Sequence, residues 1–330
     1  MGYDVYYTTG GGPWINAGSD IWVNHWLEHI SPILDTKPIL MIHRNRPIEF
    51  KNFKFPIETH WQGDNPRKFN EICNGARRIH ILHGHYTPVK CILDNKDKIY
   101  SNVLHNSVDY IIKSGMGSDV PFVYHPYMSS EWEREVSDWS KYNIWVGLFD
   151  IRIQNVNIPN FYEFKFNKEL SENTNIGFAA RPEGRKNPHY LSNHKAYLFT
   201  DSKEFGIIWK KKINSKKFKI YHYDENFKWS FYNLDWGISH SAFTGEPFGY
   251  SIFEAVDMGK LPIIHKTWCS ELEYPYRAST KSEFDDIYKK IISTSYDERK
   301  KWFDIIKNYM IENFGDKQRW IQSLLKIYNN

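Results

Sequence analysis

Residues 245–265 read GEPFGYSIFEAVDMGKLPIIH, and this pattern predicts a loop, a helix and a short strand in succession. Pro247 cannot sit inside a helix and Gly249 tolerates unusual backbone angles, so the helix is expected to begin just after them. Glu246 then lies in the loop, and Glu254 lies about one turn into the helix. The apolar LPII that follows is predicted to form a buried strand. Two carboxylates therefore flank a helix start, whose unpaired N–H groups suit an anion or a set of sugar hydroxyls.

The same alternation of strands and helices runs along the rest of the chain in two series. The first series begins with YDVYY at 3–7, and the second begins at 175 with NIGFAARPEGRKNPHYL. Short apolar runs predict further strands at 39–42, 79–82, 109–112, 122–124, 196–199, 218–222, 235–239 and 261–264. Apolar spacing predicts closing helices at 282–293 and 297–314, and a third capped by Asp316. This alternation favours an α/β fold with parallel sheets over an all-β fold or a helix bundle.

Length and composition set limits on the class of protein. At 330 residues the chain is long for one core, so we expect two domains with a cleft between them. The chain holds 13 Trp, 22 Tyr and 21 Phe, and composition alone does not separate core packing from stacking on bases or sugar rings. The net charge of +4 permits an acidic partner without demanding one.

The cysteines and the apolar runs predict a cytoplasmic protein that is not inserted in a membrane. Cys73, Cys91 and Cys269 are widely spaced and odd in number, which argues against a disulfide framework and a cysteine zinc site. A reducing cytoplasm is therefore expected. The N-terminal sequence lacks a signal-peptide pattern, and no run approaches the roughly 18 apolar residues of a membrane span.

Two cations, Arg181 and Lys186, flank the turn in ARPEGRKN that follows the first strand of the second series. Such a pair suits a diphosphate, because Arg binds bidentately and Lys adds a point charge. Solvated surface cations are the alternative. In a doubly wound sheet, however, this turn and the loop of Glu246 both leave the C-terminal ends of strands, which favours a shared crevice.

In the first half, HILHGHYTPVK at 80–90 places His83 and His85 just after a predicted strand. Alternating histidines can bind metal, but no nearby carboxylate or cysteine completes a site, so no metal is expected. A hydrogen-bonding or acid–base role is favoured, and a structural role stays open for at least one of the two. The glycine-rich TTGGGPWINAGSD is either a phosphate cradle or a plain turn, and it lacks the GKS or GKT ending of a P-loop.

Basic residues cluster at 43–47 (HRNRP), 76–80 (ARRIH) and 210–219 (KKKINSKKFK). The last cluster is interleaved with aromatic residues, a combination typical of surfaces that contact the phosphate backbone of nucleic acid. A solvated charged face is the alternative, and the sequence leaves both open.

Three motifs in the second half, IGFAARPEGRKNPHYL, FYNLDWGISHS and GEPFGYSIFEAVDMGKLPIIH, occur in this order. They resemble the donor half of retaining GT-B glycosyltransferases of the sucrose-synthase and glycogen-synthase-like group, family four of the sugar transferases. The resemblance implies two Rossmann-like domains facing across a cleft, an acceptor-side domain at 1–168 and a donor domain at 169–315. It also implies that a last helix, at 316–330, packs back on the N-terminal domain.

The resemblance further implies roles in binding a nucleotide-sugar, with UDP as the expected nucleotide. On the donor side, Arg181 and Lys186 would bind the diphosphate, and Glu254 would bind the ribose. Glu246 would lie near the transferred sugar, and the backbone of Phe248 and Gly249 would contact the sugar hydroxyls. From the other domain, Gly18 or Ser19 would approach the phosphates and His83 or His85 the sugar. One departure is Asn187, which follows the lysine where the family usually has glycine. No metal cofactor is expected, since fixed cations and helix-end dipoles can stabilise the leaving diphosphate.

For the acceptor, length, aromatic content, basic clusters and richness in Lys, Asn and Ile resemble bacteriophage proteins, including phage enzymes that glycosylate hydroxymethylated DNA bases. The leading hypothesis is therefore a sugar transferase that acts on 5-hydroxymethylcytosine or a similar base, in the host cytoplasm. A transferase for a cell-surface polysaccharide or lipid-linked acceptor is the second hypothesis. A nucleic-acid-binding protein on a degenerate GT-B fold is the third.

Overall fold

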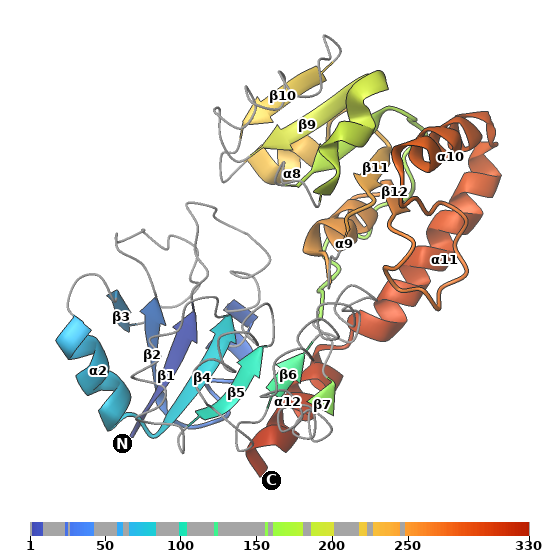
Figure 1. Cartoon of the computed structure of the whole chain (residues 1–330). Coiled ribbons are helices and arrows are strands. Elements are labelled where there is room, and N and C mark those ends of the chain that lie inside the picture. The colour runs from blue at the N-terminus through green and yellow to red at the C-terminus, as the bar shows by residue number, and fades with distance from the viewer. Residues whose placement is uncertain are drawn as a thin grey trace, which may run out of the picture. The chain divides into compact units, whose positions relative to one another are not determined.

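The computed structural model describes residues 2–8, 24–25, 27–42, 58–61, 66–83, 99–103, 122–124, 156–157, 161–180, 186–200, 218–222, 227–244 and 248–329. The chain divides into two compact units (Figure 1). The first comprises Met1–Pro126, Glu133–Asn160 and Gln318–Asn330, and the second comprises Tyr127–Trp132 and Phe161–Lys317. No helix in the described ranges is long and apolar enough to cross a membrane.

The described strands of the first unit form one parallel sheet in the order β3-β2-β1-β4-β5-β6-β7. They are β1 (Tyr3–Thr8), β2 (Lys37–Ile42), β3 (Glu58–Trp61), β4 (Arg78–His83), β5 (Ile99–Val103), β6 (Phe122–Tyr124) and β7 (Val156–Asn157), with α2 (Pro66–Gly75) between β3 and β4. Successive strands run outward from β1 to β3 on one side and from β4 to β7 on the other. The strand order therefore reverses between β1 and β4.

A buried ion pair joins these two central strands. The Nε atom of Arg78 on β4 lies 2.9 Å from Oδ2 of Asp4 on β1, and Arg78 also donates from Nη2 to the carbonyl of Leu34 at 3.1 Å. Arg78 belongs to the basic cluster at 76–80, so this cation serves the core and not a surface. Arg77 beside it is exposed, and the basic residues at 43–47 and 210–217 lie outside the described ranges.

The described strands of the second unit form a second parallel sheet in the order β10-β9-β8-β11-β12. They are β8 (Ile176–Ala179), β9 (Ala196–Thr200), β10 (Phe218–His222), β11 (Ile238–Ser241) and β12 (Leu261–Ile264). Between them lie the 3-10 helix η3 (Pro188–Asn193), α8 (Phe227–Tyr232) and α9 (Tyr250–Asp257). Here the order reverses between β8 and β11, so each unit has the doubly wound arrangement that the sequence predicts.

Strands of a parallel sheet that is covered on both faces are buried along their whole lengths, as β11 and β12 are. Of the two, β12 (LPII) reads as a continuous apolar run, whereas β11 (ISHS) buries three polar residues. Pro262 is tolerated in β12 because this strand lies at the edge of the sheet, where a missing N–H costs no ladder hydrogen bond. The strand predicted at 235–239 begins later, at Ile238. Residues 233–237 form the turn after α8, in which the indole of Trp236 donates to the carbonyl of Phe231 at 2.8 Å.

Aromatic side chains fill the core of the second unit. One buried cluster consists of Tyr197, Phe199, Phe231, Tyr232, Trp236, Ala255 and Met258. Trp236 covers Gly177 of β8 so closely that a Cβ at Gly177 would meet the indole at 2.2 Å. For these residues, the heavy aromatic content of the chain serves packing.

The carboxylate of Asp257, at the end of α9, fixes the segment that enters the second unit. Its Oδ1 accepts from the N–H groups of Phe166 at 3.1 Å and Asn167 at 2.7 Å. Its Oδ2 accepts from the N–H of Lys165 at 3.0 Å and from the Tyr162 hydroxyl at 3.1 Å. Asp257 is fully buried, so residues 161–167 are tied into the second unit.

The helices predicted at 282–293 and 297–314 are confirmed as α10 (Lys281–Ser293) and α11 (Tyr296–Phe314). Each begins at a hydroxyl cap, because Thr280 accepts from Glu283 N–H and Ser295 accepts from Glu298 N–H. The last helix, α12 (Lys317–Asn329), groups with the first unit from Gln318 onward. There the indole of Trp320 contacts the rings of His25 and His29 at centroid distances of 6.1 and 6.4 Å.

Candidate functional site

Two loops leave the second sheet at the point where its strand order reverses. The first follows β8, which ends at Ala179, and leads to Lys186; the second follows β11, which ends at Ser241, and leads to α9. Strands β8 and β11 are hydrogen-bonded neighbours. Ligands of open parallel sheets bind outside the carboxyl ends of the strands at such a reversal. The motifs around Lys186 and Gly249 therefore share one edge of one sheet.

Four of the predicted donor-side residues fall in the described ranges, namely Lys186, Phe248, Gly249 and Glu254. The remaining predicted residues outside those ranges are Gly18, Ser19, His85, Arg181 and Glu246. His83 is placed by its backbone as the last residue of β4. Because β1 and β4 flank the reversal of the first sheet, His83 lies at the corresponding edge of the first unit.

Lys186 is a buried cation, with 8% of its surface exposed. Its ammonium nitrogen lies 4.3 Å from the ring centroid of Phe243, over the ring face that attracts cations. The interpretation of Lys186 as a solvated surface cation is therefore wrong. Lys186 is a buried cation near the carboxyl edge of the sheet.

Asn187 follows Lys186 in the left-handed region, at φ 51° and ψ 42°. Among non-glycine residues, asparagine adopts this conformation most readily. It can therefore occupy the position where the sugar transferases that the motifs resemble usually have glycine. Its side-chain Nδ2 donates to the carbonyl of Ala242 and to the hydroxyl of Thr244, both at 2.9 Å. Asn187 thus connects the loop after β8 with the loop after β11.

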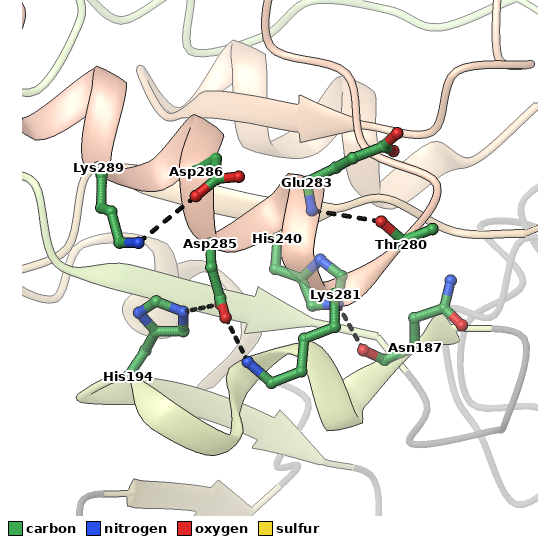
Figure 2. Close-up of polar contacts among 9 residues, drawn as sticks. All are labelled: Asn187, His194, His240, Thr280, Lys281, Glu283, Asp285, Asp286 and Lys289. Carbon is green, nitrogen blue, oxygen red and sulfur yellow. Dashed lines mark hydrogen bonds and ion pairs between the residues drawn. The ribbon is translucent and has the colours of Figure 1, made fainter.

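His240 on β11 completes this connection, as Figure 2 shows. Its Nε2 lies 2.9 Å from the carbonyl oxygen of Asn187, and because a carbonyl only accepts, Nε2 carries the proton and donates. The ring is fully buried among Phe178, Tyr190 and Phe284. This burial lowers the pKa of His240 to about 3, so the imidazole is neutral at physiological pH and acts as a fixed donor.

Figure 2 also shows how η3 is held at its other end. His194 Nε2 lies 2.7 Å from Asp285 Oδ1, and Lys281 Nζ donates to Asp285 Oδ2 at 2.6 Å. In addition, the hydroxyl of Tyr190 donates to the carbonyl of Ser279 at 2.7 Å. The short helix that follows Lys186 is therefore pinned between β11 and α10.

The start of α9 is shaped by Phe248 and Gly249. The indole of Trp268 donates to the Phe248 carbonyl at 2.9 Å, and the Phe248 ring stacks on Phe253 at 4.3 Å between centroids. Gly249 caps the helix at φ 75° and ψ 63°, a conformation suited to glycine. In a trans peptide the N–H points opposite to the C=O, so the Gly249 N–H is directed away from Trp268.

Glu254 is the fifth residue of α9, about one turn from its start as predicted, and is only 4% exposed. The Tyr232 hydroxyl donates to its Oε2 at 3.2 Å. Burial and the charge of Glu254 raise the pKa values of Tyr232 and Tyr250 well above the usual range. Both phenols therefore stay protonated around the carboxylate, which is oriented by Tyr232.

Sequence reasoning overlooked three residues of this site: Asn187 as a connector, His240 and Thr244. The one local signal was the asparagine in place of glycine after Lys186. The hydrogen bonds that give it meaning span 53 to 57 residues of chain, and no short-range pattern encodes such a contact.

No sequence profile of a known protein family matches the chain, and no curated protein sequence matches it. Its structure does have counterparts, and the fold that they share with this chain is that of the GT-B glycosyltransferases. The predicted α/β fold with parallel sheets is thereby confirmed.

Three of these counterparts illustrate the range. Sucrose-phosphate synthase from Thermosynechococcus elongatus matches with a TM-score of 0.72 at 10% identity, over 100% of this chain and 98% of that one. An alpha-glucosyltransferase in complex with UDP and a 13-mer DNA containing an HMU base gives 0.63 at 11% identity, over 100% of both chains. The lipopolysaccharide outer core galactosyltransferase WaaB, in its apo form, gives 0.55 at 12% identity, over 100% of this chain and 99% of that one.

Proposed function

We propose that this protein is a retaining glycosyltransferase that moves a sugar from a UDP-sugar to an acceptor hydroxyl. The observation that carries the proposal is Lys186, a buried cation at the carboxyl edge of the sheet where β8 and β11 meet. Helix α9 begins after the neighbouring strand, and its first N–H groups add partial positive charge. A cation beside a helix start suits the diphosphate of a nucleotide-sugar. The complex of the similar alpha-glucosyltransferase with UDP supports this choice.

In the proposed reaction, the bond between the sugar C1 and the diphosphate oxygen breaks. The bond between C1 and the acceptor oxygen forms on the same face. Lys186 and Arg181 stabilise the negative charge that develops on the leaving UDP, and an oxygen of that leaving phosphate takes the proton of the acceptor hydroxyl. Because these fixed charges supply the electrostatic stabilisation, we expect the reaction to need no metal.

Other residues bind and orient the donor in this proposal. Glu254 accepts hydrogen bonds from the ribose hydroxyls, Glu246 lies beside the transferred sugar, and the backbone of Phe248 and Gly249 contacts sugar hydroxyls. From the first unit, the glycine-rich loop with Gly18 or Ser19 meets the phosphates, and His83 or His85 meets the sugar.

The proposed acceptor is 5-hydroxymethylcytosine or a similar modified base in DNA. The support comes from the similar alpha-glucosyltransferase bound to DNA with an HMU base and from the basic residues at 43–47 and 210–219. Acting on duplex DNA would require the base to be flipped out of the stack. A bacteriophage source would place the reaction in the cytoplasm of the host.

A cell-surface polysaccharide or lipid-linked acceptor is the second candidate, favoured by the likeness to a lipopolysaccharide galactosyltransferase. A nucleic-acid-binding protein without transferase activity is less well supported. Such a protein has no need to hold Lys186 out of solvent at the strand reversal.

The test is a transfer assay with radiolabelled UDP-glucose, UDP-galactose and UDP-N-acetylglucosamine. The acceptors are DNA with hydroxymethylcytosine, DNA with hydroxymethyluracil, unmodified DNA and a lipid-linked oligosaccharide. We expect label in hydroxymethylated DNA, with the product's anomeric configuration retained. Label in the lipid-linked oligosaccharide alone would instead select the second candidate.

Variants locate the activity in this site. Arg181→Ala and Lys186→Ala should each lower transfer by about 10³-fold, the typical cost of losing one group that stabilises developing charge. The matched control is Lys289→Ala, which removes an exposed lysine of α10 paired with Asp286 and should transfer normally. Full activity in either site variant would contradict the proposed role of Arg181 and Lys186 in transfer.

A further inference from the structure

We propose that Asn187 is a positioning residue that locks the Lys186 loop to the loop after β11, so that the lysine is held ready for the donor diphosphate. This inference rests on the proposed function and assigns a role to the residue at which the chain departs from the resembling family.

The backbone at Asn187 explains only part of the choice of residue. Its φ of 51° requires a residue that tolerates the left-handed region, and glycine would meet that requirement at least as well. What glycine lacks is the side-chain amide. Any role of Asn187 beyond its backbone conformation therefore depends on the side-chain amide.

Both amide hydrogens of Asn187 are used, and both bridge to the same loop. One is accepted by the Ala242 carbonyl and the other by the Thr244 hydroxyl. The backbone carbonyl of Asn187 accepts from His240, so three hydrogen bonds join one residue to the segment 240–244. Asn187 is only 7% exposed, and hydrogen bonds shielded from water in this way are strengthened.

The same short segment also holds the ammonium group. Phe243, between the two residues that accept from the amide, supplies the ring 4.3 Å from Lys186 Nζ. The backbone after the lysine and the tip of the lysine are therefore both anchored on residues 242–244. Without the amide anchor, the loop after β8 can move relative to Phe243, and Lys186 regains conformational freedom that must be lost again on binding.

The test compares how well variants bind UDP, UMP and uridine, measured by competition against a fluorescent UDP analogue. Asn187→Gly keeps the left-handed backbone and removes the amide. Since fixing a free lysine side chain costs an amount that corresponds to roughly 10- to 30-fold in affinity, we expect UDP affinity to fall by about that factor. Uridine affinity should stay within about twofold, because uridine has no phosphate for Lys186 to contact.

Thr244 provides a second, milder probe. Thr244→Val removes one acceptor of the amide with little change in volume and should weaken UDP binding by about threefold to fivefold, since one of two amide hydrogen bonds is lost. Thr244→Ser keeps the hydroxyl and should restore UDP affinity. If Asn187→Gly does not fold, as judged by its urea unfolding curve, the Thr244 pair decides the question.

The outcomes separate the inference from the proposed function. A wild-type protein that binds no UDP would overturn the proposed function and the inference with it. A wild-type protein that binds UDP, with Asn187→Gly weakening UDP and uridine equally or leaving both unchanged, would overturn the positioning role alone.

Discussion

Helix α9 has a left-handed glycine immediately before its start and another two residues after its end, and it carries two buried acids that are held in different ways. At the C-terminal end, Asp257 is bonded to three backbone N–H groups and a phenol of residues 162–167, and Gly259 has a φ of 74°. Just before the first residue of the helix, Gly249 has a φ of 75°, and Glu254, one turn before Asp257, accepts from the side chain of Tyr232. Burial alone therefore does not distinguish a ligand-binding carboxylate from a structural one. What differs is the main donor: backbone N–H groups of a distant segment for Asp257, and the side chain of Tyr232 for Glu254.

The largest expected effect is at Asp257. Replacing it with alanine removes an acceptor from four donors, and leaving such donors poorly satisfied should lower the free energy of unfolding by about 4 kcal/mol. Urea unfolding measures this directly. At a temperature where the variant is still folded, UDP binding should be unchanged. A stable variant with weakened UDP binding would contradict the assignment of this end of α9 to architecture.

The two glycines make a matched pair for the next prediction. Gly259→Ala places a Cβ 2.0 Å from the Glu169 carbonyl oxygen, at a backbone angle that already disfavours alanine, so it should cost about 3 kcal/mol of stability. Gly249→Ala places alanine in the left-handed region and should lower the free energy of unfolding by about 1 kcal/mol.

The effects of the two substitutions on activity should be in the opposite order to their effects on stability. Gly249→Ala alters the backbone proposed to contact the sugar and should raise the KM for the UDP-sugar, whereas Gly259→Ala should leave KM unchanged. Steady-state transfer kinetics on both variants check this. Equal KM values would remove the functional distinction between the two ends.

The sequence predicts where α9 and β12 lie along the chain, but it does not predict the contacts that α9 makes with residues far away in the sequence. Pro247 and Gly249 fix the start of α9, and apolar runs locate β12, because both signals act over a few residues. The resemblance places residues 161–168 in the first domain, whereas the structure ties 161–167 into the second unit through Asp257. That tie joins residues 90 to 95 positions apart, and no periodicity within either segment reveals it.

The candidate site divides in the same way. Residue type and position after a strand suffice to nominate Lys186 and Glu254, because parallel topology brings such positions to one edge. These signals favour a shared crevice for Lys186 and keep a solvated surface cation as the alternative. Only the fold supplies the Phe243 ring and the Asn187 anchor that separate these two interpretations.

Glu254, the acid proposed to bind the ribose, provides the third prediction. Glu254→Gln keeps the shape and an oxygen that can accept from Tyr232, but it replaces the charged acceptor proposed for the ribose hydroxyls with a neutral one. A hydrogen bond to a charged group is worth about 2 kcal/mol, so UDP affinity should fall about 30-fold. Titration calorimetry measures the affinity.

The matched control is Asp257→Asn, which changes the other buried acid of α9 to its amide. It should lose stability in urea and keep its affinity for UDP. The reverse result, with Glu254→Gln unfolding easily and Asp257→Asn binding poorly, would exchange the roles given to the two acids.

The smallest effect is a pH dependence at the architectural end. Lys260 follows Gly259, and its Nζ donates to the Trp236 carbonyl at 2.5 Å. Burial lowers the pKa of Lys260 to about 8, from an ordinary value of 10.5. Between these two values the unfolded chain binds more protons than the folded one, so the contribution of Lys260 to stability must rise with pH.

Lys260→Met isolates that contribution, because methionine fills a similar volume and does not titrate. From pH 8 to pH 9, the free energy of unfolding of the wild type should gain about 1 kcal/mol relative to the variant, measured in urea. Tyr250 adds no slope in this range, since burial and Glu254 raise its pKa well above the usual value and the unfolded phenol ionises only near pH 10. A difference that stays flat or falls with pH would mean that Lys260 is solvated, and that this end of α9 is less tightly closed than Asp257 and Gly259 indicate.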